Sequence, residues 1–76
     1  MILIDDKGHM VSDVSLDELH AFVVDTLGLS RHYCQEPPKH RIPHYDLIGK
    51  RKQYKAFESG AALTSTRNLV IKAVRP

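Results

Sequence analysis

One amphipathic stretch, residues 15–27, constrains the fold of this chain more than any other feature. Ser15 and Glu18 fit a capping box, in which each side chain accepts a hydrogen bond from the backbone N–H of the other residue. Gly28 follows at the position where helices commonly end. Between these two signals, apolar residues recur at helical spacing: Leu16, Leu19, Val23 and Leu27. We predict a helix over residues 15–27, whose apolar stripe needs a second layer of structure to cover it.

The sequence predicts a small sheet as this second layer. Residues 1–4 form a continuous apolar run that is too short and too uniform for a helix, and the run predicts a buried strand. Further strands are expected at residues 9–11, at residues 44–47 and, at an edge, near residues 61–63. Further helices are expected at residues 48–58 and 66–75. The sequence therefore predicts a single α/β (α+β) domain over residues 1–76, with three or four short strands packed by about three helices.

A chain of 76 residues is small for a domain that has to be stable alone. Such domains bury only about 60% of their unfolded surface, so we expect help from a metal ion, a partner or a second copy in a homodimer. The single Cys34 excludes an internal disulfide, as is usual in a reducing cytosol. No run approaches the roughly 20 apolar residues of a membrane span, and the start of the chain lacks a basic signal-peptide region. We expect a soluble cytoplasmic protein.

Charge is divided unevenly along the chain. Residues 1–27 carry one Lys and six acidic residues, whereas residues 28–76 carry ten Lys or Arg and three acidic residues. Clustered cations attract polyanions, so the basic part predicts a phosphate-bearing partner such as a nucleotide or nucleic acid. The alternative is an ordinary solvated basic face that the acidic part neutralises.

Chemically reactive side chains are most concentrated around residues 43–46, after a Pro-rich loop. Alternate side chains of an extended strand share a face, so His44 and Asp46 are expected to point one way and Tyr45 the other. A same-face imidazole and carboxylate suit two tasks: binding a metal ion together, or acting as a base with its orienting carboxylate. The structural alternative is that Asp46 caps the next helix.

Other residues are expected to join this pair. Asp5 and Asp6 follow the first strand, and ligands of open α/β sheets gather outside the carboxyl ends of strands; a simple polar turn is the alternative. The predicted metal ligands are Asp5, His9, His44 and Asp46, and the predicted catalytic groups are His44, Asp46 and Asp6. The predicted ligand-binding residues are Lys50, Arg51 and Arg41. A divalent metal ion, Zn²⁺, Mn²⁺ or Mg²⁺, is the cofactor expected there.

These residues also carry a resemblance to a known family. The chain resembles the small bacterial and phage proteins grouped as domain of unknown function 4031, over nearly its whole length and in the family's order. The matching segments are Ile4-Asp5-Asp6, His9-Met10, Asp17-Glu18-Leu19-His20-Ala21, Leu27-Gly28-Leu29, Gln35, Pro43-His44-Tyr45-Asp46-Leu47, Lys50-Arg51 and Gly60-Ala61. The resemblance implies which residues cluster, and it implies no particular activity.

Three functional interpretations stay open, and with them the question whether the protein is an enzyme. The first is binding of a phosphate-containing ligand, or metal-dependent phosphoester hydrolysis, through the Asp/His/Arg cluster. The second is a non-catalytic module that binds nucleic acid through the basic residues Arg41, Lys50, Arg51, Lys52 and Lys55. The third is a protein-interaction module in which the polar cluster is structural.

Overall fold

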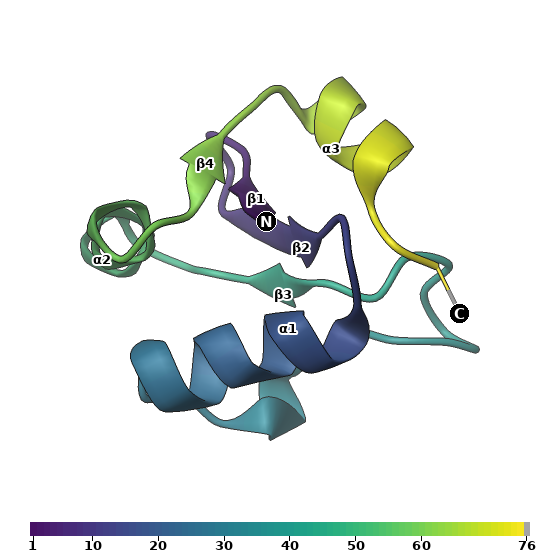
Figure 1. Cartoon of the computed structure of the whole chain (residues 1–76), viewed down its shortest axis with the longest axis horizontal. Coiled ribbons are helices and arrows are strands. Elements are labelled where there is room, and N and C mark those ends of the chain that lie inside the picture. The colour runs from purple at the N-terminus through teal and green to yellow at the C-terminus, as the bar shows by residue number, and fades with distance from the viewer. Residues whose placement is uncertain (76) are drawn as a thin grey trace.

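A four-stranded mixed sheet lies at the centre of the computed structural model, which describes residues 1–75 (Figure 1). Its strands are β1 (Ile2–Ile4), β2 (His9–Ser12), β3 (Tyr45–Asp46) and β4 (Ala62–Leu63), in the spatial order β3-β2-β1-β4. β2 runs antiparallel to β1 and to β3, whereas β4 pairs with β1 in parallel. The predicted fold class, a small α+β domain, is confirmed.

Three α-helices pack around this sheet in the described part of the chain: α1 (Leu16–Ala21), α2 (Lys50–Glu58) and α3 (Thr66–Lys72). α1 continues into a π-helix at Phe22–Thr26, and a short 3-10 helix follows at Arg31–Tyr33. Figure 1 shows α1 and α3 on opposite sides of the strands. None of the helices within residues 1–75 is long and apolar enough to cross a membrane.

The sheet is buried on both faces, which explains the uninterrupted apolar run of β1. One core contains Ile2, Ile4, Met10 and Tyr45 from the strands together with Leu19, Val23 and Leu27. The second core joins Leu3 and Val11 to Leu69 and Ala73 of the α3 segment. Alternate residues of each strand thus face α1 and α3 in turn, so the neighbours of Met10 and Tyr45 along the chain lie on the α3 face.

The start of α1 differs from the predicted capping box. Ser15 Oγ accepts a hydrogen bond from the Glu18 N–H at 3.0 Å, as predicted. The Glu18 carboxylate does not return to Ser15, because it accepts from Ser12 Oγ at 2.5 Å. Ser12 Oγ in turn accepts from the Ser15 N–H at 3.1 Å. Ser12, buried at the end of β2, therefore accepts the hydrogen bond from the Ser15 N–H that the glutamate accepts in a capping box.

The bounds of the other two helices are also narrower than predicted. α2 begins at Lys50, since Gly49 with φ of 96° is its N-cap residue. Asp46 consequently stays in β3 and does not cap this helix. α3 ends at Lys72, three residues earlier than expected, and Ser65 caps its start by accepting a hydrogen bond from the Asn68 N–H at 3.1 Å.

Candidate functional site

Sheet geometry brings four of the predicted site residues to one end of the α3 face. His9 of β2 lies directly opposite Asp46 of β3, and His44 precedes Asp46 by two residues. Tyr45 between them points into the core on the α1 side. Asp5 follows β1 and contacts His9. The alternation of an extended chain therefore places the two histidines and two carboxylates together.

The turn between β1 and β2 fixes the position of His9. Gly8 in this turn has φ of 93°, a conformation that side chains disfavour. Its carbonyl accepts a hydrogen bond from the Leu47 N–H at 2.8 Å, just after β3. A Cβ atom at Gly8 would lie only 2.2 Å from the Leu47 carbonyl oxygen. Only glycine allows this close approach, which holds His9 in register with Asp46.

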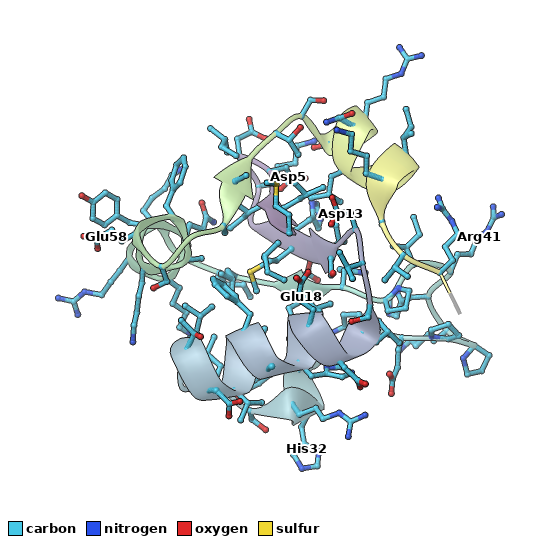
Figure 2. All side chains as sticks on the ribbon, viewed as in Figure 1. Asp5, Asp13, Glu18, His32, Arg41 and Glu58 are labelled. Atoms are coloured by element: carbon cyan, nitrogen blue, oxygen red, sulfur yellow. The ribbon has the colours of Figure 1, made fainter. Side chains whose placement is uncertain are left out.

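Asp5 is a buried carboxylate at the base of the site, with 1% of its surface exposed (Figure 2). Its Oδ1 accepts hydrogen bonds from the N–H groups of Lys7 and His9, at 3.0 and 2.9 Å. Its Oδ2 accepts from His9 Nδ1 and from Thr66 Oγ1, both at 2.8 Å. Burial raises the pKa of Asp5, but these hydrogen bonds outweigh burial and hold the pKa below its ordinary value of 3.8. Asp5 is therefore ionised at neutral pH.

The partners of the two imidazoles determine their tautomers. An ionised carboxylate can only accept, so His9 Nδ1 carries the proton that it donates to Asp5. The carbonyl of Ile42 likewise can only accept, so His44 Nδ1 carries the proton of their 2.7 Å hydrogen bond. In their neutral forms, both histidines thus keep an unprotonated Nε2.

Both Nε2 atoms face the same oxygen of Asp46. Asp46 Oδ1 lies 3.6 Å from His9 Nε2 and 3.5 Å from His44 Nε2. When both histidines are neutral, two lone pairs and an anionic oxygen face one another, and three such acceptors repel. A cation between them turns the repulsion into attraction. The arrangement therefore suits a metal ion, or a proton on one of the Nε2 atoms.

The three atoms are spread out rather than gathered around one point. In residues 1–75, only one group of three His, Cys, Asp or Glu side chains has ligand atoms that all lie within 4.8 Å of one another, and that group is elsewhere. Zn²⁺ holds nitrogen and oxygen ligands at about 2.0–2.2 Å. Metal binding therefore requires the imidazoles and the Asp46 side chain, which is 44% exposed, to draw together.

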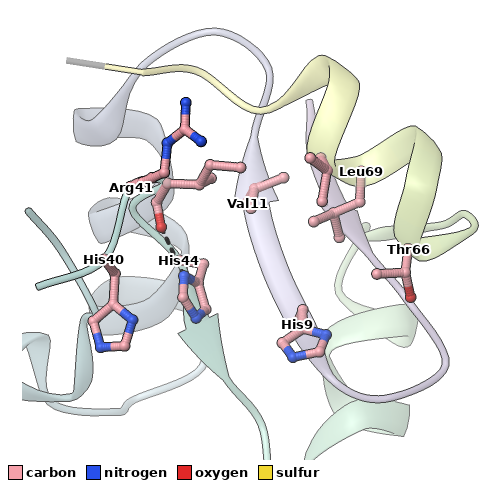
Figure 3. Close-up of a pocket in the computed structure, with 9 residues that line it drawn as sticks. His9, Val11, His40, Arg41, His44, Thr66 and Leu69 are labelled. Carbon is pink, nitrogen blue, oxygen red and sulfur yellow. Dashed lines mark hydrogen bonds between the residues drawn. The ribbon is translucent and has the colours of Figure 1, made fainter.

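A groove of about 360 Å³ opens beside the two histidines (Figure 3). Polar or cationic side chains from three segments line it, among them His9, His40, Arg41, His44 and Thr66. The ring centroid of His44 lies 5.9 Å from that of His9 and 5.6 Å from that of His40, with edge-on geometry. Leu69 and Val70 of α3 add an apolar wall. A ligand in this groove would meet three imidazoles, with Arg41 at the edge (Figure 3).

The structure does not bring all the predicted site residues together. Arg41 lines the groove with the histidines, but Lys50 and Arg51 lie on α2 and line two other hollows. Asp6 is exposed and shares the hollow of Lys50. Asp6 lies in the turn after β1, and its side chain lines that hollow and not the groove of the histidines.

Two contributors to the site were not predicted. The Thr66 hydroxyl donates a hydrogen bond to Asp5, which lies 61 residues away along the chain. His40 belongs to the Pro-rich loop, where no local pattern marks its side chain as part of the groove. Both residues reach the site only through the tertiary fold, so the sequence held no signal for either.

Comparison with known proteins identifies the family of the chain. A family model described as protein of unknown function (DUF4031) matches residues 5–75. The match begins at the buried Asp5 and includes both histidines and Asp46. Neither the curated proteins nor the solved structures contain a match to the chain. The family match covers nearly the whole sequence and confirms the resemblance drawn from the residues, so the chain belongs to the DUF4031 family of proteins of unknown function.

Proposed function

We propose that the protein binds a divalent transition-metal ion through His9, His44 and Asp46 and uses it to hydrolyse a phosphoester in the adjacent groove. One observation carries the proposal: two Nε2 atoms face a single carboxylate oxygen, at 3.6 and 3.5 Å. Each imidazole is held through its other nitrogen. In its neutral form, neither ring can turn a protonated nitrogen toward Asp46 without losing that hydrogen bond.

The partners of the imidazoles support a metal more than a structural role. Histidines that bind metals usually donate their second ring N–H to a carboxylate or a backbone carbonyl. His9 donates to the carboxylate of Asp5, and His44 donates to the carbonyl of Ile42. Two imidazoles and one carboxylate form a known ligand set for catalytic Zn²⁺ and for non-haem Fe²⁺, and they leave positions open for water and substrate. Zn²⁺ and Mn²⁺ are the ions to test first.

The lining of the groove supports a phosphate-bearing substrate. Arg41 lies at the edge of the groove, with its guanidinium turned away from both histidines (Figure 3). Rotation of this exposed side chain would let the guanidinium bind two oxygens of a phosphate in the groove. A bound metal ion would lower the pKa of a water molecule and neutralise charge on the phosphate during hydrolysis. Leu69 and Val70 would contact the alcohol portion of the ester. Asp5 and Thr66 would hold His9 in place and not touch the substrate.

Isothermal titration calorimetry tests the metal site. The parent protein, freed of metal with EDTA and dialysed, is titrated with ZnCl₂ and with MnCl₂. We expect His44→Ala and Asp46→Ala to weaken binding at this site by about tenfold or more, as losses at metal sites commonly do. His32→Ala is the matched control, because His32 is exposed on the 3-10 helix, far from the groove (Figure 2).

Hydrolysis of bis(p-nitrophenyl) phosphate then tests the reaction. We expect metal-dependent release of nitrophenolate that His44→Ala abolishes and His32→Ala leaves unchanged. Arg41→Ala should raise KM, since it removes a phosphate contact. Equal metal stoichiometry and affinity in the parent and in the His44 and Asp46 variants would refute the metal site. Binding without any hydrolysis would refute the enzymatic part of the proposal alone.

The basic surface of α2 favours a second candidate function, binding of nucleic acid. Lys50, Arg51 and Lys52 occupy its first turn, where the helix dipole disfavours positive charge. Among residues 1–75, these cations form no ion pair with a carboxylate within 4.0 Å. The phosphates of a nucleic-acid backbone would offset the unfavourable interaction of these cations with the helix dipole. Binding to double-stranded DNA or RNA that weakens steeply with salt, and that Arg51→Ala reduces, would support this function over hydrolysis.

A further inference from the structure

We propose a second metal site, formed by His20, Cys34 and Glu36, that holds Zn²⁺ or a similar thiophilic divalent cation and ties α1 to the segment leading into β3. One ligand atom from each residue lies within 4.8 Å of the other two. Neighbouring ligands of a tetrahedral Zn²⁺ are about 3.3–3.6 Å apart, given bonds of about 2.0–2.3 Å. Small side-chain movements would therefore close the site. The inference is independent of the groove and of its proposed function.

The backbone already holds the two flexible ligands in place. Gln35, between Cys34 and Glu36, forms a bridge with His44 through hydrogen bonds of 2.8 and 3.0 Å between their main chains. Cys34 also packs against the core on the α1 side. His20 projects from α1, an element that lies far from this segment along the chain. A metal ion here would join two parts of the fold that no disulfide can join.

The imidazole of His20 is oriented by a buried partner. Its Nδ1 lies 2.6 Å from the hydroxyl oxygen of Tyr45, and Tyr45 is 1% exposed. An imidazole that is held before the metal arrives loses little side-chain freedom on binding.

The donor atoms of the group fit a thiophilic cation. Burial raises the pKa of the Cys34 thiol, so a metal ion that binds here must displace the thiol proton. Thiolate, imidazole and carboxylate are all Zn²⁺ ligands, and the thiolate excludes Mg²⁺ and Ca²⁺ as preferred ions.

The position of the group suggests a stabilising role. Glu36 begins the loop that carries His40, Arg41 and Ile42 to the groove. A metal at Glu36 would anchor this loop to α1, and a chain of 76 residues gains stability from such a staple. The fourth ligand position would face solvent, since Glu36 is exposed.

Cobalt substitution tests the site, because only a thiolate ligand gives Co²⁺ a sulfur-to-metal charge-transfer band. The metal-free, reduced full chain is titrated with CoCl₂ and its absorption spectrum is recorded. We expect the band in the parent and its displacement by one equivalent of ZnCl₂. Cys34→Ser should abolish it, and His20→Ala and Glu36→Ala should each weaken Co²⁺ binding by about tenfold or more. His32→Ala, Glu58→Ala and His44→Ala should leave it unchanged.

The outcomes separate this site from the groove. A groove metal bound by His9, His44 and Asp46 gives no charge-transfer band, so failure of that site leaves this prediction intact. Absence of the band in the parent overturns the proposal. A band that persists with unchanged affinity in both His20→Ala and Glu36→Ala overturns it too. Glu36→Ala keeps the test sound if His20→Ala fails to fold, because Glu36 is exposed.

Discussion

Replacing Asp5 by Asn tests how strongly the buried carboxylate organises the site. The substitution preserves shape and removes the charge. One oxygen can still accept the backbone N–H groups of Lys7 and His9. The new NH₂ group, however, meets His9 Nδ1 and the Thr66 hydroxyl, both of which donate to the carboxylate in the parent. Both partners must then become acceptors, and His9 must move its proton to Nε2.

The expected cost follows from the four hydrogen bonds. A hydrogen bond to a charged group contributes about 1.5–3 kcal/mol, against about 0.5–1.5 kcal/mol for a neutral one. The two backbone bonds weaken and the two side-chain bonds reverse, while the desolvation cost of the charge disappears. We expect Asp5→Asn to lower the free energy of unfolding by about 2–4 kcal/mol, a large share of the stability of a small domain. Asp5→Ala should cost more, because it leaves buried donors without a partner.

Urea denaturation at pH 7, followed by circular dichroism, measures this cost. Thr66→Val is the companion variant: it removes one donor, keeps the charge and should cost about 1 kcal/mol. Zn²⁺ binding supplies a second readout: a His9 proton on Nε2 should weaken Zn²⁺ binding in the groove of Asp5→Asn even where the protein remains folded. An Asp5→Asn protein as stable as the parent within about 0.5 kcal/mol would refute the reasoning, because that is the usual size of a surface substitution.

Two further predictions concern stability. Gly8→Ala should cost more than about 2 kcal/mol in urea denaturation, since it adds a collision with the Leu47 carbonyl to the strain of φ at 93°; Gly60→Ala, with φ of 117° and open space, supplies the strain-only control. The hydroxyl of Ser12 first, and the N-terminal ammonium second, hold the pKa of Glu18 below its ordinary value of 4.5. Its stabilising contribution is therefore present above that pH and lost as the pH falls further, so Glu18→Gln should flatten the acid side of the stability curve. An unchanged acid side would contradict this assignment.

Local patterns in the sequence were sufficient to predict most of the fold. The stripe from Leu16 to Leu27 and its end at Gly28 are set by neighbours along the chain, and the structure has both. The positions and caps of helix ends, in contrast, depended on contacts with residues from other elements. At the start of α1, the Ser12 hydroxyl and not Glu18 accepts the Ser15 N–H, because burial of β2 brings that hydroxyl within reach of the helix terminus.

The same distinction between local pattern and distant contacts separates the predictable from the unpredictable parts of the site. The shared face of His44 and Asp46 follows from alternation in one strand and was predictable. Thr66 holding Asp5 depends on two segments 61 residues apart, and no local pattern encodes it. Lys50 and Arg51 lie close to the histidine in sequence, but the start of α2 carries them to other hollows. Lys50, Arg51 and Arg41 were predicted to bind the ligand together, and of these three only Arg41 lines the groove.

The central claim is that His9 and His44 present unprotonated Nε2 atoms to a metal ion beside Asp46. The most direct measurement is long-range ¹H–¹⁵N correlation NMR of the imidazole nitrogens, with and without one equivalent of Zn²⁺, at a pH where both rings are neutral. The account predicts that both rings carry their proton on Nδ1 and that Zn²⁺ shifts both Nε2 resonances. Protons on Nε2, or Nε2 resonances that Zn²⁺ leaves unchanged, would contradict it.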